Sequence, residues 1–242
     1  MSTISTVQTY SPIVELRHYT LHPGQRETLI ELFDREFLEG QESVGIKVIG
    51  QFRNLDDANS FVWLRGFDDM QTRQQALTGF YTGPIWQAHR NAANDTMIDS
   101  DNVLLLKPAR TTSGFKLEQT RPTLDAKAIP NCLVVISIAY LTQAADNAIL
   151  EYFEQALMPI LNQNGAQVLA SFITEPSENT YPKLPVRNEH VFIWISRFAN
   201  LADYKNHIEN LEQTKATALL SRWLTRPLEV LQLSPTTRSR LH

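Results

Sequence analysis

Four pairs of similar segments recur in the same order along this 242-residue chain, and this repetition constrains the fold more than any other feature. Taken as first copy and second copy, the pairs are LIELFD and ILEYFE, GIKVIGQF and GAQVLASF, FVWLRGF and FIWISRF, and VLLLKP and VLQLSP. They lie 120, 120, 131 and 127 residues apart. The second copy therefore carries an eleven-residue insertion, within EPSENTYPKLPVRNEH, whose three prolines indicate a loop. The repetition predicts a tandem duplication.

Each copy carries the same succession of elements. In the first copy, β-rich residues 13–21 precede His22-Pro23-Gly24, after which apolar residues recur at helical spacing from Leu29 to Phe37. Strands are then predicted over 47–52, 61–65 and 103–107, with a helix after Asp69 that Gly83-Pro84 interrupts and restarts. The order β-α-β-β-α-β favours a four-stranded antiparallel sheet with both helices on one face.

The second face of each sheet also has to be hidden from water. Because the copies carry similar strands, we expect the two sheets to pack face to face around a core or small cavity. The sequence thus predicts an α+β protein with one unit at 12–108, a polar linker at 109–129 and a second unit at 130–235. The chain would be its own dimer, with further pairing into a homodimer left open.

Composition excludes several classes of protein. A net charge of −4, with no long run of Lys or Arg, argues against a nucleic-acid partner. The single cysteine, Cys132, rules out an internal disulfide and favours a reducing compartment, and no apolar run approaches the length of a membrane span, so we expect a cytoplasmic protein. The chain contains no GxGxxG, P-loop, GxSxG, HExxH or CxxC motif, so neither a metal site nor a cofactor is predicted from motifs.

Candidate site residues lie on the first strand of the first copy. Alternation along a strand sends Glu15, Arg17 and Tyr19 to one side, and we expect that side to face the barrel interior, with Leu16 facing the helices. Glu15, Arg17 and Tyr19 are then the catalytic candidates, and Trp63 and Arg65 would join them as substrate-binding residues. The alternative is a buried ion pair that only sets the register of the strands, since buried charges need partners.

The second copy lacks these charges. At the offsets above, the residues at 15, 17, 19 and 65 become Val135, Ser137, Ala139 and Ser196, while the tryptophan is retained as Trp194. A site would therefore be single and belong to the first half, with Trp194 as a further wall of the pocket or as core packing.

The histidines are weaker candidates. His18 and His22 are four residues apart on a strand that runs into a turn, a spacing that does not bring two imidazoles together on a metal. His18 joins the site as a substrate-binding residue only if the faces of the first strand are inverted. His89 is a candidate axial haem ligand, although a surface histidine on a helix is the simpler interpretation.

The segments VELRHYTLHPG, FVWLRGFDD and GPIWQAHRNA resemble the NIPSNAP family, within the dimeric α/β-barrel (ferredoxin-like) superfamily. The resemblance covers residues 13–108, whereas the second copy has LVVISIAYL where the first has VELRHYTL. It implies two tandem ferredoxin-like units. It implies no single reaction, because relatives include cofactor-free monooxygenases, isomerases, haem-handling enzymes and proteins without an assigned activity.

Three functions follow from these features. The first is a NIPSNAP-like protein that binds a small, flat, largely apolar molecule in a single pocket between the two sheets. The second is a non-catalytic scaffold or protein-interaction module with a filled barrel. The third is a cofactor-free monooxygenase or isomerase, or a haem-binding enzyme, in which Arg17 or Arg65 stabilises an oxyanion and Glu15 or Tyr19 moves a proton.

Overall fold

The computed structural model describes residues 10–117, 120–214 and 218–242. The first half of the chain contains β1 (Ile13–Leu21), α1 (Arg26–Leu32), η1 (Phe33–Phe37), α2 (Leu38–Glu42), β2 (Lys47–Asn54), β3 (Ser60–Phe67), α3 (Met70–Thr82), α4 (Pro84–Asn94), β4 (Met97–Asp99) and β5 (Val103–Pro108). The second half contains β6 (Leu133–Tyr140), α5 (Asn147–Tyr152), η2 (Phe153–Leu157), α6 (Met158–Gln163), β7 (Gln167–Thr174), β8 (Val191–Phe198), α7 (Leu201–Thr214), η3 (Ala218–Arg222) and β9 (Glu229–Pro235).

Local signals in the sequence set these boundaries. The Asp69 carboxylate caps α3 by accepting a hydrogen bond from the Thr72 backbone N–H at 2.6 Å, and the Thr72 hydroxyl accepts one from the Asp69 backbone N–H at 2.9 Å. Proline occupies the first turn of α4, as expected. Gly45 and Gly165 precede β2 and β7 with φ of 93° and 91°, which a side chain would strain. The short strand β4 was not predicted.

The strands close into one antiparallel barrel. Within the first half the strand order is β5-β1-β3-β2, and within the second it is β9-β6-β8-β7. Strand β2 pairs with β9 through Phe52 and Pro235, and β5 pairs with β7 through Pro108 and Phe172. Strand β4 attaches to β1 outside the eight-stranded ring. The predicted α+β class is confirmed. The two sheets, which we expected to pack face to face as a pseudo-dimeric α/β barrel, are also joined at both edges by hydrogen bonds, so that the barrel is closed.

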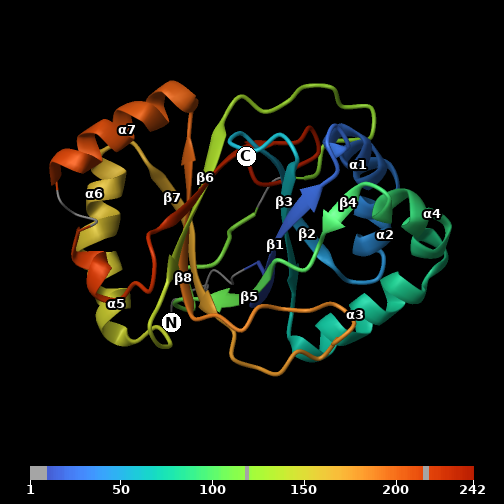
Figure 1. The fold of residues 1–242 in the computed structure, drawn as a ribbon, viewed down its shortest axis with the longest axis horizontal. Helices are drawn as coiled ribbons and strands as arrows, with labels where there is room; N and C mark the ends of the chain where they lie inside the picture. The colour runs from blue at the N-terminus through green and yellow to red at the C-terminus, as the bar shows by residue number, and fades with distance from the viewer. Residues whose placement is uncertain (1–9, 118–119, 215–217) are drawn as a thin grey trace, which may run out of the picture.

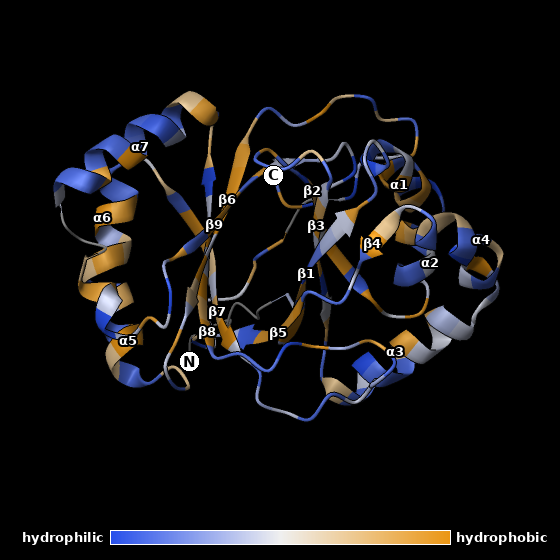
Figure 2. Ribbon diagram, viewed as in Figure 1, coloured by the Kyte–Doolittle hydropathy of each residue, from blue (hydrophilic) through white to orange (hydrophobic). Residues whose placement is uncertain are grey.

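Helices cover the outside of the barrel on two opposite sides. Figure 1 shows α1 to α4 against the first half's strands and α5 to α7 against the second half's, with the barrel between them. The strands are mostly apolar in Figure 2, whereas α7 is mostly polar, as expected for a helix with one face in solvent. No helix among the described residues is long and apolar enough to cross a membrane.

Side chains fill the barrel interior. Every strand of the ring contributes to this core, including Val14 and Leu16 of β1, and Phe115 and Leu241 enter it from outside the strands. A cavity beside this core, next to His18 and lined by Leu16 and Leu104, measures about 10 Å³. The expected pocket between the two sheets is therefore too small for an organic ligand.

The face assignment of β1 is also corrected. Leu16 points into the barrel, and Glu15, Arg17 and Tyr19 point toward the helices, the reverse of the expectation. The alternation of side chains along a strand shows which residues share a face, but it does not show which face points into the barrel. Both sets here are buried, because helices cover the outer face and the opposite half covers the inner one.

The two halves share irregularities as well as strands. A π-helical turn occurs at Phe33–Phe37 and again at Phe153–Leu157, and a β-bulge follows Val48 and again follows Val168. Each pair of features is separated by the same 120 residues as the matched sequence segments.

Because the barrel is filled, replacing a large core side chain by a small one should lower the free energy of unfolding considerably. Phe172 is fully buried, and its ring centroid lies 5.1 Å from that of Phe115. We expect Phe172→Ala to lower the free energy of unfolding by about 3–5 kcal/mol in urea denaturation. Ile98→Ala, at a side chain that is 59% exposed, is the control and should change it by less than about 0.5 kcal/mol. Equal stabilities of the two variants would contradict a packed barrel.

Candidate functional site

A buried cluster of four charged side chains lies between the first half's sheet and its helices. Arg65 faces Glu15 directly across the β1–β3 pair, Arg17 is two residues along β1, and Arg73 comes from α3. Glu15 Oε2 accepts hydrogen bonds from Arg17 Nη1 at 2.8 Å and Arg65 Nε at 2.7 Å, and Oε1 accepts one from Arg73 Nε at 2.7 Å. All four residues are at most 1% exposed.

The cluster carries more positive charge than negative. In the described part of the chain, Glu15 is the only carboxylate within ion-pair distance of the three guanidiniums. Burial alone would raise the pKa of the Glu15 carboxyl, but the charges of Arg65, Arg17 and Arg73 outweigh it and hold the pKa far below its usual range. One carboxylate and three arginines leave a formal excess of two positive charges away from water, an arrangement that calls for an anionic partner.

Aromatic rings and neutral polar groups surround the guanidiniums. Arg17 Nε donates to the Tyr19 hydroxyl at 3.0 Å, and Arg65 Nη1 lies 3.3 Å from the Tyr81 hydroxyl and 3.5 Å from Gln41 Oε1. The Arg65 guanidinium also lies 5.1 Å from the centroid of the Trp63 ring. The structure thus brings together five of the seven predicted site residues: Glu15, Arg17, Tyr19, Trp63 and Arg65.

The other two predicted site residues lie elsewhere. Trp194 occupies the matching position in the second half, where it packs against Phe153 in that half's own helix layer. His18 points into the barrel, and its Nε2 lies 2.7 Å from the Ser60 hydroxyl. Neither residue shares the surroundings of Glu15, because Trp194 belongs to the opposite half and His18 to the opposite face of β1.

Arg73 was missed at the sequence level although the sequence contains a signal for it. It lies one helical turn before Ala76 and Leu77, on the stripe of α3 that packs against the sheet. An arginine on an apolar stripe needs a buried acceptor, which here is Glu15.

The insertion of the second half covers this cluster. Residues 175–190, in orange in Figure 1, run from the barrel to α3. Arg73 Nη1 donates to Asn179 Oδ1 at 3.0 Å and lies 3.3 Å from the Thr180 hydroxyl, and Tyr181 stacks on Tyr81 at 6.1 Å. The second half therefore closes a site whose charges belong to the first.

An aromatic cavity lies beside the cluster. Its volume is about 30 Å³, and it is lined by Tyr19, Trp63, Gln41 and Tyr81 together with apolar side chains such as Phe37. This volume is about one water molecule's share of liquid water. The cavity is too small in this conformation for a flat organic molecule.

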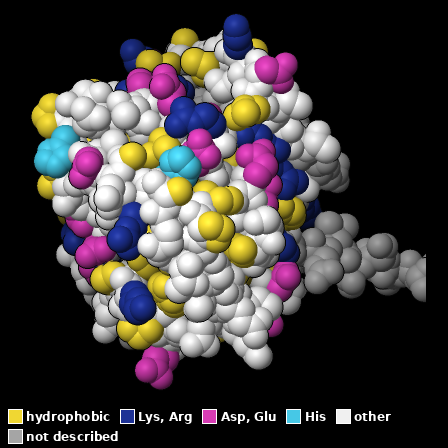
Figure 3. Space-filling model, turned by 90° about the vertical axis from the view of Figure 1, so that its right-hand side faces the viewer, with side chains coloured by type: hydrophobic (Ala, Val, Ile, Leu, Met, Phe, Trp, Pro, Cys, Tyr) yellow, Lys and Arg dark blue, Asp and Glu magenta, His cyan; other side chains and the backbone are white. Residues whose placement is uncertain are grey.

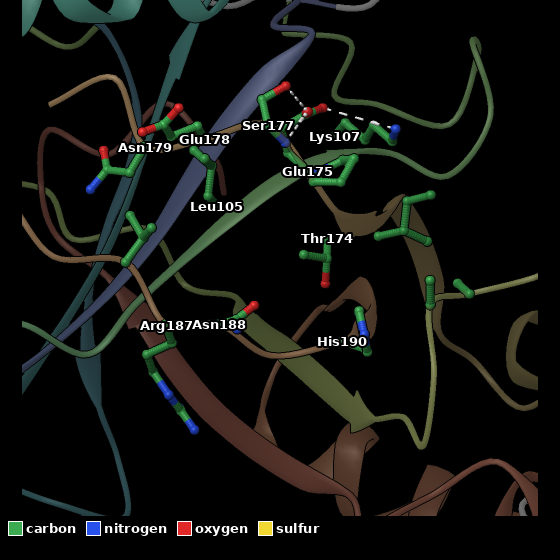
Figure 4. Close-up of a pocket in the computed structure, with 15 residues that line it drawn as sticks. Leu105, Lys107, Thr174, Glu175, Ser177, Glu178, Asn179, Arg187, Asn188 and His190 are labelled. Atoms are coloured by element: carbon green, nitrogen blue, oxygen red, sulfur yellow. Dashed lines mark hydrogen bonds and ion pairs between the residues drawn. The ribbon is translucent and has the colours of Figure 1, made fainter. Parts of the chain in front are cut away.

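A larger cleft of about 510 Å³ lies on the other side of the inserted loop, where β5 meets β7. Figure 4 shows Leu105 and Thr174 in its wall, Lys107 and Glu175 at one end, and Arg187 and His190 at the other. Leu105 is the cross-strand partner of Glu15, and Asn179, which also lines the cleft, is the acceptor for Arg73. The cleft is thus separated from the charged cluster by a single layer of side chains.

The outer surface over this half shows no comparable concentration of charge. In the view of Figure 3, which faces the side of α3 and α4, basic and acidic side chains are interspersed with scattered hydrophobic ones. The excess positive charge of the first half is therefore hidden beneath the helices.

The described residues contain no cluster suited to a metal ion, and His89, the candidate haem ligand, lies beside a carboxylate. No group of three His, Cys, Asp or Glu side chains is placed to hold a metal ion there. His89 Nε2 lies 3.4 Å from Glu36 Oε2, and the neighbouring aromatic cavity does not admit a porphyrin. Cys132 is buried, and burial raises the pKa of its thiol.

Replacing the central carboxylate tests the cluster. Glu15→Gln leaves three guanidiniums without their buried counter-charge, so we expect the free energy of unfolding at pH 7 to fall by about 3–5 kcal/mol. Because folding lowers the pKa of Glu15 from its ordinary 4.5, its contribution is complete above about pH 4.5 and is lost as the pH falls further.

The stability difference between the unaltered protein and Glu15→Gln should accordingly be constant from pH 7 to about 5 and shrink by about 1.4 kcal/mol per pH unit below 4.5. Urea unfolding at several pH values measures it, with the exposed Glu31→Gln as control. A difference that stays constant down to pH 3 would contradict the ion-pair geometry.

Comparison with known proteins identifies the first half of the chain. Residues 14–112 match the NIPSNAP family model. No curated protein matches the sequence significantly. Among solved structures, a "putative monooxygenase" from Fusobacterium nucleatum has a TM-score of 0.59 at 9% identity, covering 93% of both chains. An anthrone oxidase-like protein also has a TM-score of 0.59, at 11% identity, covering 95% of this chain and 93% of the other.

A NIPSNAP domain protein from Burkholderia xenovorans matches over a shorter stretch, at 21% identity. The match covers 40% of this chain and 94% of that protein, with a TM-score of 0.37. The two full-length likenesses establish the α/β-barrel fold at identities that say nothing about activity. The family match agrees with the segments in which the sequence resembles NIPSNAP proteins, so residues 14–112 of this chain match the NIPSNAP family.

Proposed function

We propose that this protein binds a small, flat, largely apolar molecule in the cleft between its two halves, at the junction of β5 and β7. The observation that carries the proposal is the cleft itself, whose volume of about 510 Å³ lies within the range of small-molecule sites. The proposed ligand is the one expected from the sequence. Its proposed place is this cleft, because the barrel interior is filled.

The composition of the cleft supports this assignment. Its apolar wall comes from both halves and consists of Leu105, Ala144, Ala145, Ile173, Pro176 and Val186. Its charged side chains lie at the ends, where they would orient a polar group of the ligand (Figure 4). A second cleft of about 480 Å³, between residues 110–117 and the second half, does not approach the charged cluster and serves as the internal comparison.

A cofactor-free oxygenase or isomerase is the second candidate, favoured by the fold shared with proteins described as monooxygenase and oxidase. In this reaction class Arg17 and Arg65 would stabilise an oxyanion that develops on the substrate. Glu15 is poorly suited to move a proton near neutral pH, because its lowered pKa makes it a weak base. Tyr19 is then the better candidate for proton donation.

The filled barrel favours a third candidate, a non-catalytic scaffold in which the buried charges only fix the packing of α3 on the sheet. Such a protein would bind no small molecule at the cleft, so the ligand-binding experiment below separates it from the first two candidates.

We also propose that the chain is a tandem duplication of two ferredoxin-like units, at 12–108 and 130–235, joined by residues 109–129. The shared π-helical turns, bulges and strand orders support this history. Residues 118–119 of the linker lie outside the described residues. The duplication accounts for a single site, because only the first unit carries the charged cluster and only the second carries the loop that covers it.

Binding of N-phenyl-1-naphthylamine, a neutral flat molecule that fluoresces in apolar surroundings, tests the proposed cleft. We expect saturable binding to the full chain, and we expect Ala144→Trp, which places a large ring in the cleft, to weaken it about tenfold or more. Fluorescence titration and native mass spectrometry measure the affinity and the stoichiometry.

Thr112→Trp is the matched control, because it places the same ring at an exposed position in the second cleft. It should leave the affinity unchanged. If only Thr112→Trp abolished binding, the binding site would be the second cleft. If the unaltered protein showed no saturable binding, the non-catalytic scaffold would be favoured.

A further inference from the structure

The aromatic cavity beside the cluster is lined by hydrogen-bond donors that have no acceptor. A hydroxyl group has one proton to donate, and the Tyr19 and Tyr81 oxygens each accept a hydrogen bond from a guanidinium, which only donates. Each phenol therefore keeps its proton for another partner, and neither proton has an acceptor among the described residues. Burial also raises the pKa of Tyr19, so its proton is retained at neutral pH.

Two further donors line the same cavity. Trp63 is 2% exposed, and its buried Nε1 has no hydrogen-bond partner among the described residues. Gln41, 1% exposed, uses its Oε1 toward Arg65, which leaves its NH₂ group as a donor. The four residues that carry these donors thus line a cavity of about 30 Å³.

The charges around the cavity also favour a bound anion. The guanidiniums of Arg65 and Arg17 lie 5.1 and 5.6 Å from the Trp63 ring, immediately behind the lining of the cavity. The loop that covers the cluster presents the neutral side chains of Asn179 and Thr180 to Arg73, so it satisfies hydrogen bonds without supplying negative charge. Arg73 Nη2 also has no hydrogen-bond partner in the part of the chain that the structure describes.

We propose that the aromatic cavity is a binding site for one small monovalent anion of about the size of chloride. The ion accepts hydrogen bonds from the four donors and offsets part of the buried positive charge. A water molecule matches the site less well, because it brings two donors of its own into a cavity already lined by donors. The volume admits one such ion and excludes tetrahedral oxyanions.

Crystals of the full chain grown in sodium bromide test the proposal directly. Data collected at the bromine absorption edge should show an anomalous peak in the cavity, within hydrogen-bonding reach of Trp63 Nε1 and the two phenols. An ordered water there, with no anomalous signal, would overturn the proposal.

Thermal unfolding provides an independent measurement. An ion present at about ten times its Kd should raise the Tm by about 3 °C in potassium bromide or chloride, relative to potassium gluconate of equal ionic strength, whose anion is too large to enter. Equal Tm values in the three salts would overturn the proposal.

Trp63→Phe removes the indole N–H while keeping an aromatic ring, and we expect it to abolish the halide-specific rise in Tm. Trp194→Phe, at the matching position of the second half, is the control and should keep the rise, since the described residues around Trp194 include no buried arginine cluster. A full rise in Trp63→Phe would place the ion elsewhere and overturn the assignment. Failure of the naphthylamine to bind in the cleft would leave this result unaffected, because the two sites are separate.

Discussion

Each half of this protein forms a sheet with two apolar faces, and its own helices can cover only one of them. The second face is buried against the other half, and the hydrogen bonds from β2 to β9 and from β5 to β7 convert that contact into a closed barrel. Closure removes the strand edges and leaves an interior that side chains from all eight strands fill. Any site for chemistry is therefore displaced to the outside of the barrel.

The space beneath the helices differs sharply between the two halves. In the first half it holds Glu15 and three arginines, and in the second the same positions of the sheet carry small or apolar residues such as Val135 and Ser196. The second half contributes the loop 175–190, which covers the cluster and forms one wall of the adjacent cleft. The charged cluster thus belongs to one half, and the loop that covers it belongs to the other.

The charged cluster lies between the two proposed sites and contacts the wall of each. Glu15 lies opposite Leu105, a wall of the cleft, and Arg65 contacts Tyr81, a wall of the aromatic cavity. Because all of its members are buried, a change in one of them alters the electrostatic potential on both sides at once.

The sequence by itself determined the repeated segments and, apart from β4, the elements of the first half with boundaries close to those observed. It also showed that the charged residues of the first strand have no counterparts in the second copy. Three short segments also resemble the NIPSNAP family, and the match of residues 14–112 to the family model confirms this resemblance. These features are local, since spacing, turn residues and capping residues act within a few positions of one another.

Only the tertiary structure decided which face of β1 points inward. Alternation separates Glu15, Arg17 and Tyr19 from Leu16, but both faces are buried, so exposure to water could not identify the inner one. The partners Gln41 and Asn179 were likewise beyond the sequence, because Gln41 reaches Arg65 from another helix and Asn179 reaches Arg73 from a loop more than 100 residues away. Contacts of this kind form only when the fold brings together residues that are far apart in the sequence, and no local pattern indicates them.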